Sequence, residues 1–338
     1  MLERKKVYVT RNLPGPGLSM LSKECDVSLH HGHRPPARKQ MLKAIAGKNG
    51  IVCMLSDRID KEAMDVAGPK LEVISSYSTG FEHIDVAEAT RRGIYVTFTS
   101  DILAETTADL TFALMLACAR NIVQGDEFVR QGKWKYGWAP DLMLGYDVYR
   151  TTLGILGMGR IGSAVARRAK GFDMKVIYYS RKRRMDLEAE IGIKYVEMDE
   201  LLEQSDFISL HTSLNPKSFH IIDRSKFSKM KKTAFVINTA RGQLINQEDL
   251  AIALKSGQIA GAGLDVFEIE PLPGPDPLTK MKNVVLLPHI GSATYNTRSR
   301  MSVIAAQNLL NVLNGIAPLY LVNPEVMNIR PLQSQTGN

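Results

Sequence analysis

Residues Thr151–Gly162 constrain the fold of this chain more than any other segment. They read Thr-Thr-Leu-Gly-Ile-Leu-Gly-Met-Gly-Arg-Ile-Gly, an apolar run followed by glycines at Gly157, Gly159 and Gly162 and then by a helical pattern. The first glycine permits a tight turn after a strand, the second lets the backbone approach a pyrophosphate, and the third allows close helix packing. The helix N-terminus adds amides and positive potential. The segment therefore predicts a dinucleotide-binding βαβ unit, with a purely structural glycine turn as the alternative.

Short apolar strands alternate with helical stretches along most of the chain, which is typical of parallel α/β folds. The expected strands are Val7–Thr10, Ile51–Met54, Val73–Ser75, Tyr95–Thr97, Leu153–Leu156, Met174–Tyr179, Phe207–Leu210, Ala234–Ile237, Ala262–Val266 and Val284–Leu287. An apolar helical stretch at Ile102–Val123 separates the two sets, and an aromatic arm follows from Trp134 to Tyr149. The pattern predicts two doubly wound parallel-sheet domains.

The last predicted helix, Ser302–Leu313, follows the final strand of the second set. Because the second sheet is then complete, we expect this helix to cross back and make the first domain discontinuous. The expected boundaries are 1–101 with 292–338 for the first domain and 102–291 for the second. A chain of 338 residues is long enough for two domains with separate cores.

Composition narrows the range of partners and compartments. The formal charge is +8 and the pI about 9.3, but with one exception the basic residues are spread along the chain, which favours anionic small molecules over nucleic acid. The three cysteines are far apart and lack metal-binding spacing. His30–His33 has no further ligand nearby, so no metal is expected. Without a long apolar run or a secretory start, we expect a cytoplasmic protein with no membrane segment.

The second strand of the dinucleotide-binding unit ends at Ser180, about 20 residues beyond the glycine turn, where an acidic residue would bind a free ribose 2′-hydroxyl. Arg181 and Lys182 follow it, and Arg183 and Arg184 complete a dense basic run. A hydroxyl and a guanidinium suit a 2′-phosphate, and no carboxylate is there to repel it. We predict NADPH as the cofactor, with NADH as a weaker one; a solvated basic loop is the alternative.

Three segments with chemically useful side chains follow later strands: Asn238–Gly242, Gly263–Pro271 and Leu287–Ser292. Loops at the carboxyl ends of parallel strands meet at one edge of the sheet, so residues far apart in sequence can converge on one ligand. Reduction of a 2-oxoacid needs a cation for the carboxylate and an acid for the ketone oxygen. Arg241 suits the first role, His289 the second, and Glu270 can hold the imidazole in the required tautomer.

Taken together, these motifs resemble the D-isomer-specific 2-hydroxyacid dehydrogenase family, and most closely its glyoxylate/hydroxypyruvate reductase members, from about Val7 to Val322. The resemblance implies two Rossmann-like domains, with the substrate bound by the discontinuous one. It implies a hydride transfer from NADPH to a small 2-oxoacid, giving glycolate or D-glycerate. It also implies a homodimer built by the arm at about residues 122–150.

The resemblance extends the set of predicted site residues. The residues expected to bind cofactor are Gly157, Met158, Gly159, Arg160, Ile161, Gly162, Ser180, Arg181, Lys182, Thr107, Thr239, Ala240, Asp265 and Gly291. Asp265 is expected to orient the nicotinamide carboxamide. Substrate is expected to contact Leu55, the backbone amides of Thr79 and Gly80, and the side chains of Arg241 and His289.

Two alternatives remain open from the sequence. A D-lactate-type dehydrogenase with a broad 2-oxoacid range has the same catalytic residues, and the fold also serves corepressor-like proteins that sense NAD(P)H. Leu142 stands where several glyoxylate reductases carry an aromatic residue, and Ser213 replaces a common proline. The difference at Leu142 leaves the preferred substrate size open. The difference at Ser213 leaves open which residues contact the cofactor near its adenosine.

Overall fold

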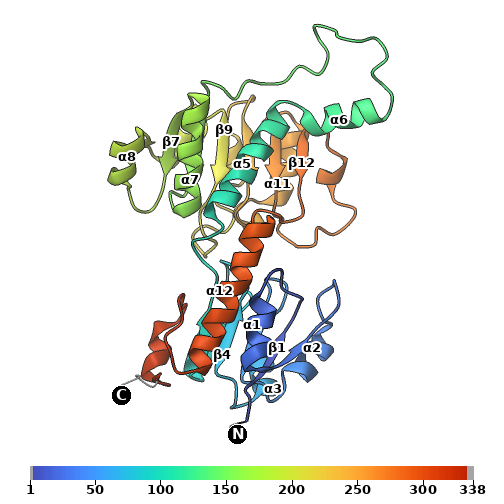
Figure 1. The fold of residues 1–338 in the computed structure, drawn as a ribbon. Coiled ribbons are helices and arrows are strands. Elements are labelled where there is room, and N and C mark those ends of the chain that lie inside the picture. The colour runs from blue at the N-terminus through green and yellow to red at the C-terminus, as the bar shows by residue number, and fades with distance from the viewer. Residues whose placement is uncertain (1–2, 333–338) are drawn as a thin grey trace. The chain divides into compact units, whose positions relative to one another are not determined.

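The computed structural model describes residues 3–332, which form two compact units (Figure 1). Unit 1 is made of the chain up to Ile102 together with the chain from Ala293, and unit 2 is Leu103–Ser292. Residues 1–2 and 333–338 of the predicted first domain lie outside the described residues. The predicted α/β class, with two parallel sheets and a discontinuous first domain, is confirmed.

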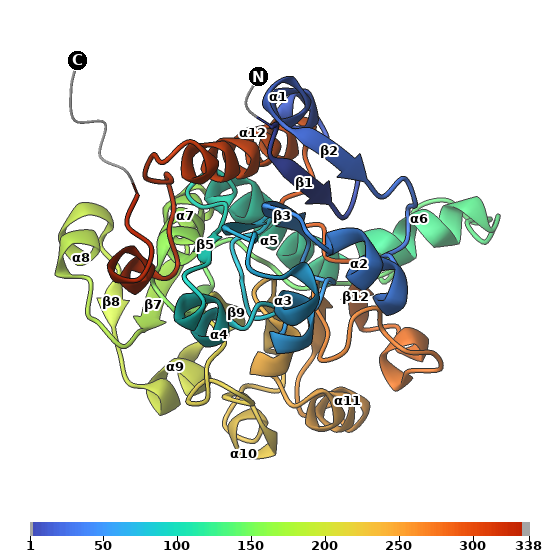
Figure 2. The same cartoon turned by 90° about the horizontal axis from the view of Figure 1, so that it is seen from below.

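Unit 1 is built on a five-stranded parallel sheet with the order β2-β1-β3-β4-β5. The strands are β1 Lys6–Val9, β2 Asp26–Leu29, β3 Gly50–Cys53, β4 Val73–Ser76 and β5 Tyr95–Thr97. Helices α1 (Gly17–Glu24) and α12 (Tyr295–Leu313) cover one face, and α2 (Arg38–Ile45), α3 (Lys61–Ala67) and α4 (Val86–Arg91) cover the other (Figure 2). Alternate residues of each strand therefore enter two separate cores.

Two elements of unit 1 differ from the sequence prediction. Strand β2 was not predicted, because it is a half-exposed edge strand whose residues mix polar and apolar types without a clear pattern. Helix α12 begins at Tyr295 rather than Ser302. Its N-cap is Thr294, whose hydroxyl accepts a hydrogen bond from the Thr297 amide at 3.2 Å, and a threonine cap of this kind fixes where a helix starts.

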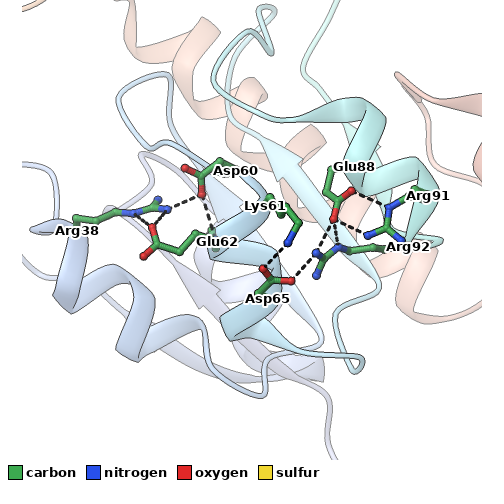
Figure 3. A network of polar contacts seen from close by, with 9 residues as sticks. Arg38, Asp60, Lys61, Glu62, Asp65, Glu88, Arg91 and Arg92 are labelled. Carbon is green, nitrogen blue, oxygen red and sulfur yellow. Dashed lines mark hydrogen bonds and ion pairs between the residues drawn. The ribbon is translucent and has the colours of Figure 1, made fainter.

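Ion pairs join the outer helices of unit 1 (Figure 3). Arg38 of α2 pairs with Asp60, which also caps α3, and with Glu62. Arg92 joins Asp65 of α3 to Glu88 of α4. Hydrogen bonds from Arg91 and Arg92 lower the pKa of Glu88 to about 2. Single surface pairs contribute little stability, so this network holds the helices in register without implying a binding site.

Unit 2 contains a seven-stranded parallel sheet with the order β12-β11-β10-β9-β6-β7-β8. The strands are β6 Thr152–Leu156, β7 Lys175–Tyr179, β8 Lys194–Tyr195, β9 Phe207–Leu210, β10 Phe235–Asn238, β11 Gly261–Leu264 and β12 Val284–Leu286. All six predicted strands are present, and β8, only two residues long, was missed. The strand order reverses between β6 and β9, which is where ligands bind in open sheets of this type.

Helices cover both faces of the unit 2 sheet. One face carries α5 (Ala104–Ala119) and α7 (Arg160–Ala169). The other carries α9 (Met198–Gln204), α10 (Arg224–Phe227) and α11 (Gln247–Lys255). The central strands are buried on both sides, which explains why they read as continuous apolar runs. Within residues 3–332, no helix is both long and apolar enough to cross a membrane.

The arm of unit 2 consists of α6 (Ile122–Arg130) and the irregular segment that follows it up to residue 150, which loops away from the sheet (Figure 1). Helix α6 buries none of its residues. Tyr136 and Trp138 are 95% and 83% exposed. The end of the arm returns to the unit, where the Tyr146 amide donates to the Ala119 carbonyl at 2.8 Å.

Candidate active site

The glycine turn after β6 has the geometry that a dinucleotide requires. Gly157 has a φ of +99°, and a Cβ there would lie 2.6 Å from the backbone of His211. A Cβ on Gly162 would lie 2.1 Å from the Gly157 carbonyl oxygen, so α7 approaches the turn too closely for any side chain. A Cβ on Gly159, the N-cap of α7, would meet nothing within 4 Å. The turn is therefore closed where it packs and open at the helix N-terminus, where a pyrophosphate would fit.

The side chains of the other residues in the turn differ in how exposed they are. Met158 is 2% exposed and packs into the core between α5 and the sheet, so it offers a ligand only its backbone. Ile161 is half-buried against the same core, whereas Arg160 is exposed. Of the three, only Arg160 has an exposed side chain.

Two residues of the basic run after β7 form ion pairs with α8 (Met185–Ile191), and the other two do not. Arg183 pairs with Glu188 at 2.7 Å, and Arg184 pairs with Asp186 at 2.6 Å, both on α8. The exposed side chains of Arg181 and Lys182 form no hydrogen bond or ion pair within residues 3–332. The two predicted cofactor contacts are therefore the two members of the run that are not engaged by the protein itself.

Glu270 and His289 meet beyond the carboxyl ends of β11 and β12. His289 Nδ1 lies 2.7 Å from Glu270 Oε2, and Glu270 Oε1 accepts a hydrogen bond from the Phe267 amide at 3.1 Å. Burial opposes ionisation of Glu270, but the His289 hydrogen bond and charge, the Phe267 amide and the charge of Arg241 hold its pKa below the ordinary value. The pair is about one-third exposed. With Nδ1 engaged by a carboxylate, Nε2 is the ring nitrogen left for proton transfer.

Asp265 fixes the backbone that carries His289. Its Oδ1 accepts from the Ile290 amide and its Oδ2 from the Gly291 amide, both at 2.7 Å, and its carbonyl accepts from the His289 amide at 2.9 Å. His289 has a φ of +54°, a left-handed conformation that needs such support. Burial raises the pKa of Asp265, while the two amides and His289 act in the opposite direction. The sequence suggested a contact with nicotinamide for this residue, and the structure adds a positioning role that was not foreseen.

Asn238 shapes the turn that carries Arg241. This buried side chain accepts from the Ala240 amide at 3.0 Å and donates to the Arg241 carbonyl at 2.9 Å. The next residue, Gly242, starts the 3₁₀ turn η2 (Gly242–Leu244), and a Cβ on it would lie 1.8 Å from the Phe267 carbonyl carbon. Neither Asn238 nor Gly242 was predicted from the sequence to have a role. An asparagine at a strand end is a common turn former and was the available signal.

The remaining predicted cofactor residues of unit 2 also come together. Thr107, at the start of α5, donates from Oγ1 to the Gly291 carbonyl at 3.3 Å. The Thr239 hydroxyl lies 3.0 Å from that of Thr111, one turn further along α5. Thr107, Thr239 and Ala240 are all buried. Helix α5 thus anchors the loops after β10 and β12.

The predicted substrate residues of unit 1 follow two neighbouring strands, β3 and β4. Leu55 is 37% exposed beyond β3. Beyond β4, the Thr79 hydroxyl donates to the Thr99 carbonyl, and the Gly80 carbonyl accepts from the hydroxyls of Ser76 and Ser78. The amides of Thr79 and Gly80 donate no hydrogen bond within the described part of the chain. Backbone amides without an acceptor are groups that can bind an anion.

Comparison with known proteins identifies the family. Residues 112–291 match the NAD binding domain of the D-isomer specific 2-hydroxyacid dehydrogenases. A protein of Korarchaeum cryptofilum named glyoxylate reductase is 50% identical over 328 residues, which cover 97% of this chain and 98% of the relative.

Solved structures give the same result. A protein from Thermus thermophilus superposes with a TM-score of 0.88 at 45% identity, covering 94% of this chain and 99% of that one. An NADPH-dependent glyoxylate/hydroxypyruvate reductase from Sinorhizobium meliloti, in complex with NADP and malonate, superposes with a TM-score of 0.83 at 29% identity, covering 99% and 100%. The resemblance inferred from the sequence is confirmed: this chain is an oxidoreductase of the D-isomer specific 2-hydroxyacid dehydrogenase family.

Proposed function

We propose that this protein reduces glyoxylate and hydroxypyruvate to glycolate and D-glycerate with NADPH, using Arg241, Glu270 and His289. The observation that carries the proposal is the 2.7 Å contact between His289 Nδ1 and Glu270 Oε2, with the charge of Arg241 acting on the same carboxylate. The relative named glyoxylate reductase, at 50% identity over nearly the whole chain, supports the substrate class.

The proposed chemistry divides between these side chains. When bound, the nicotinamide would supply the hydride for the carbonyl carbon next to the carboxylate. His289 donates its Nε2 proton to the carbonyl oxygen, so that the product carries a neutral hydroxyl group and the imidazole becomes neutral. Glu270 holds the ring through Nδ1 and favours the protonated imidazole at the start of the reaction. Arg241 pairs with the carboxylate of the substrate through its planar guanidinium and polarises the adjacent carbonyl.

We also assign substrate contacts to Leu55, Thr79 and Gly80 of unit 1. The amides of Thr79 and Gly80 bind carboxylate without relying on a side chain, which suits every 2-oxoacid equally. Leu55 supplies an apolar contact. Discrimination between glyoxylate and hydroxypyruvate is modest, because one additional carbon in a pocket changes binding by only about 1–3 kcal/mol.

We assign the preference for NADPH to Ser180, Arg181 and Lys182. Arg183 and Arg184 are engaged by Glu188 and Asp186, which leaves the first two cations of the run for a 2′-phosphate. The glycine turn would hold the pyrophosphate of the cofactor. Its nicotinamide end would be held by Thr107, Thr239, Ala240, Asp265 and Gly291. NADH lacks the phosphate and is the weaker cofactor.

We further propose that the protein forms a homodimer through the arm. We also propose that it is located in the reducing environment of the cytoplasm. The exposed aromatic side chains of the arm support the dimer, because aromatic residues are enriched in interfaces relative to the rest of the surface. The three cysteines are free and buried, which supports the reducing compartment.

A rate panel tests the function directly. Glyoxylate, hydroxypyruvate and pyruvate are each reduced with NADPH and with NADH, and kcat/KM is compared. We expect the first two substrates and NADPH to give the highest values. Fastest turnover of pyruvate would favour a D-lactate-type enzyme, and equal or better use of NADH would refute the cofactor assignment.

Arginine substitutions in the basic run separate cofactor recognition from structure. Arg181→Ala removes a charge-assisted contact of about 1.5–3 kcal/mol, so KM for NADPH should rise tenfold or more while KM for NADH stays the same. Arg183→Ala is the matched control, because this guanidinium already pairs with Glu188. An unchanged NADPH-to-NADH ratio in Arg181→Ala would remove that residue from the site.

A further inference from the structure

We propose that Glu268 and His220 form a second histidine–glutamate pair, a positioning pair that locks the Glu270 loop against the turn carrying Arg241. The inference rests on the proposed role of Glu270. Glu268 stands two residues before Glu270 in the segment after β11, and its Oε1 lies 2.8 Å from His220 Nε2. Neither residue belongs to the predicted substrate or cofactor contacts.

Glu268 uses its backbone as well as its side chain to tie three segments together. Its Oε1 also accepts a hydrogen bond from the Gln247 amide at 2.8 Å. Its backbone amide donates to Gln247 Oε1 at 3.1 Å, and its carbonyl accepts from Gln243 Nε2 at 2.7 Å. Because the carboxylate, the amide and the carbonyl are all engaged, the loop has little freedom at this residue.

His220 has further contacts besides the one with Glu268. Its amide donates to the Gln243 carbonyl at 2.9 Å, and its ring stacks on Phe219 with centroids 3.9 Å apart. Asn246 Nδ2 lies 3.5 Å from His220 Nδ1, and Asn246 Oδ1 is committed to the Asp249 amide as the cap of α11. The His220 ring is thus held beside Asn246 and Phe219, with its Nε2 in close contact with Glu268.

These contacts connect the turn that carries Arg241 to the loop that carries Glu270. Gln243 lies on η2, two residues after Arg241, and contacts both Glu268 and His220. Gly242 packs directly on the Phe267 backbone, one residue before Glu268. The turn that carries Arg241 and the loop that carries Glu270 are thus joined through Glu268 and Phe267. This junction sets the position of Glu270 relative to Arg241.

The test is a double-mutant comparison of Glu268→Ala in the wild-type and Glu270→Gln backgrounds. Loosening a reacting group by about 1 Å can cost about 100-fold in rate, so we expect Glu268→Ala to lower kcat by about 10- to 100-fold in the wild-type background. KM for NADPH should remain unchanged, because the glycine turn is on a different loop. In the Glu270→Gln background the same change should cost less than about threefold, because Glu268 acts through Glu270.

Control variants separate positioning from general damage to the fold. Ile269→Ala changes the exposed residue between the two glutamates and should leave kcat unaltered. Glu268→Gln keeps an acceptor oxygen for Gln247 and should recover part of the rate. His220→Ala gives an independent test in the same two backgrounds if Glu268→Ala does not fold, as judged by circular dichroism.

The outcomes distinguish the two proposals. Equal losses from Glu268→Ala in both backgrounds, or no loss in the wild-type background, would overturn the positioning role while leaving the proposed function intact. If Glu270→Gln itself retained full activity, the role proposed for Glu270 would fail, and the positioning role with it, whereas a wild-type protein without reductase activity would refute the proposed function. A loss confined to the background that retains Glu270 supports both.

Discussion

Replacement of Gly242 by alanine tests whether the Arg241 turn is held directly against the Glu270 loop. A Cβ on Gly242 would lie 1.8 Å from the Phe267 carbonyl carbon and 2.0 Å from its oxygen. Carbon atoms pack at about 3.5 Å, so the two backbones must separate by about 1.7 Å. Both contacts are with backbone, which cannot move aside as the tip of a side chain can. Arg241, the neighbouring residue, must move with its turn.

The expected losses follow from that displacement. A misplacement of about 1 Å can cost about 100-fold in rate, so kcat/KM for glyoxylate should fall at least about 100-fold. Overpacking costs about 1–3 kcal/mol of stability, which lowers the melting temperature of a unit of this size by roughly 2–12 °C. The rate should fall far more than the stability, because the displaced residue carries the proposed substrate contact.

Steady-state kinetics and a thermal melt of the same preparation measure both losses. Gly171→Ala is the matched control, because a Cβ at Gly171 would meet nothing within 4 Å and should leave both values unchanged. Near wild-type kcat/KM in Gly242→Ala would refute the reasoning, since it would mean that the two loops are not in rigid contact or that the Arg241 turn does not contribute to the reaction.

Three further predictions concern Asp265, Glu270 and the arm. Asp265→Asn places an amide group against a backbone N–H and should cost about 1–3 kcal/mol in urea unfolding together with a lower kcat; wild-type stability would contradict this. The native pKa of Glu270 is below its ordinary value of 4.5, so the stability that its ionised form contributes is present above that value and is lost as pH falls through the native pKa. The stability difference between wild type and Glu270→Gln should therefore be larger at about pH 6 than at about pH 3, and a pH-independent difference would speak against it. Trp138→Ser with Tyr136→Ser should shift the sedimenting species from dimer toward monomer, and an unaltered dimer would place the interface elsewhere.

Much of the site could be predicted because its signals are local. Gly157, Gly159 and Gly162 are read from a strand, a turn and a helix within twelve residues, and each has the surroundings that its spacing implies. Edge elements were harder to predict, since β2 and β8 are short and lack two buried faces. A periodic apolar pattern arises only where a core is packed on the strand.

The interactions between loops could not be predicted. Asn238 and Gly242 are unremarkable in sequence, yet one shapes the Arg241 turn and the other touches the Phe267 backbone. The basic run reads as four equivalent cations, and only the position of α8 shows that Arg183 and Arg184 are occupied. Glu268 and Glu270 look alike in one loop, but they contact different histidines.

The sequence by itself determined the α/β class, the glycine turn and the placement of Arg241, Glu270 and His289 after strand ends, because strand periodicity and turn chemistry depend on near neighbours in the chain. Only the tertiary structure decided that Glu270 faces His289 Nδ1 and that Asp265 holds the left-handed backbone beside it. Distances between loops depend on the order of strands in the sheet and on how helices pack over it, and those depend on contacts between residues far apart in the chain.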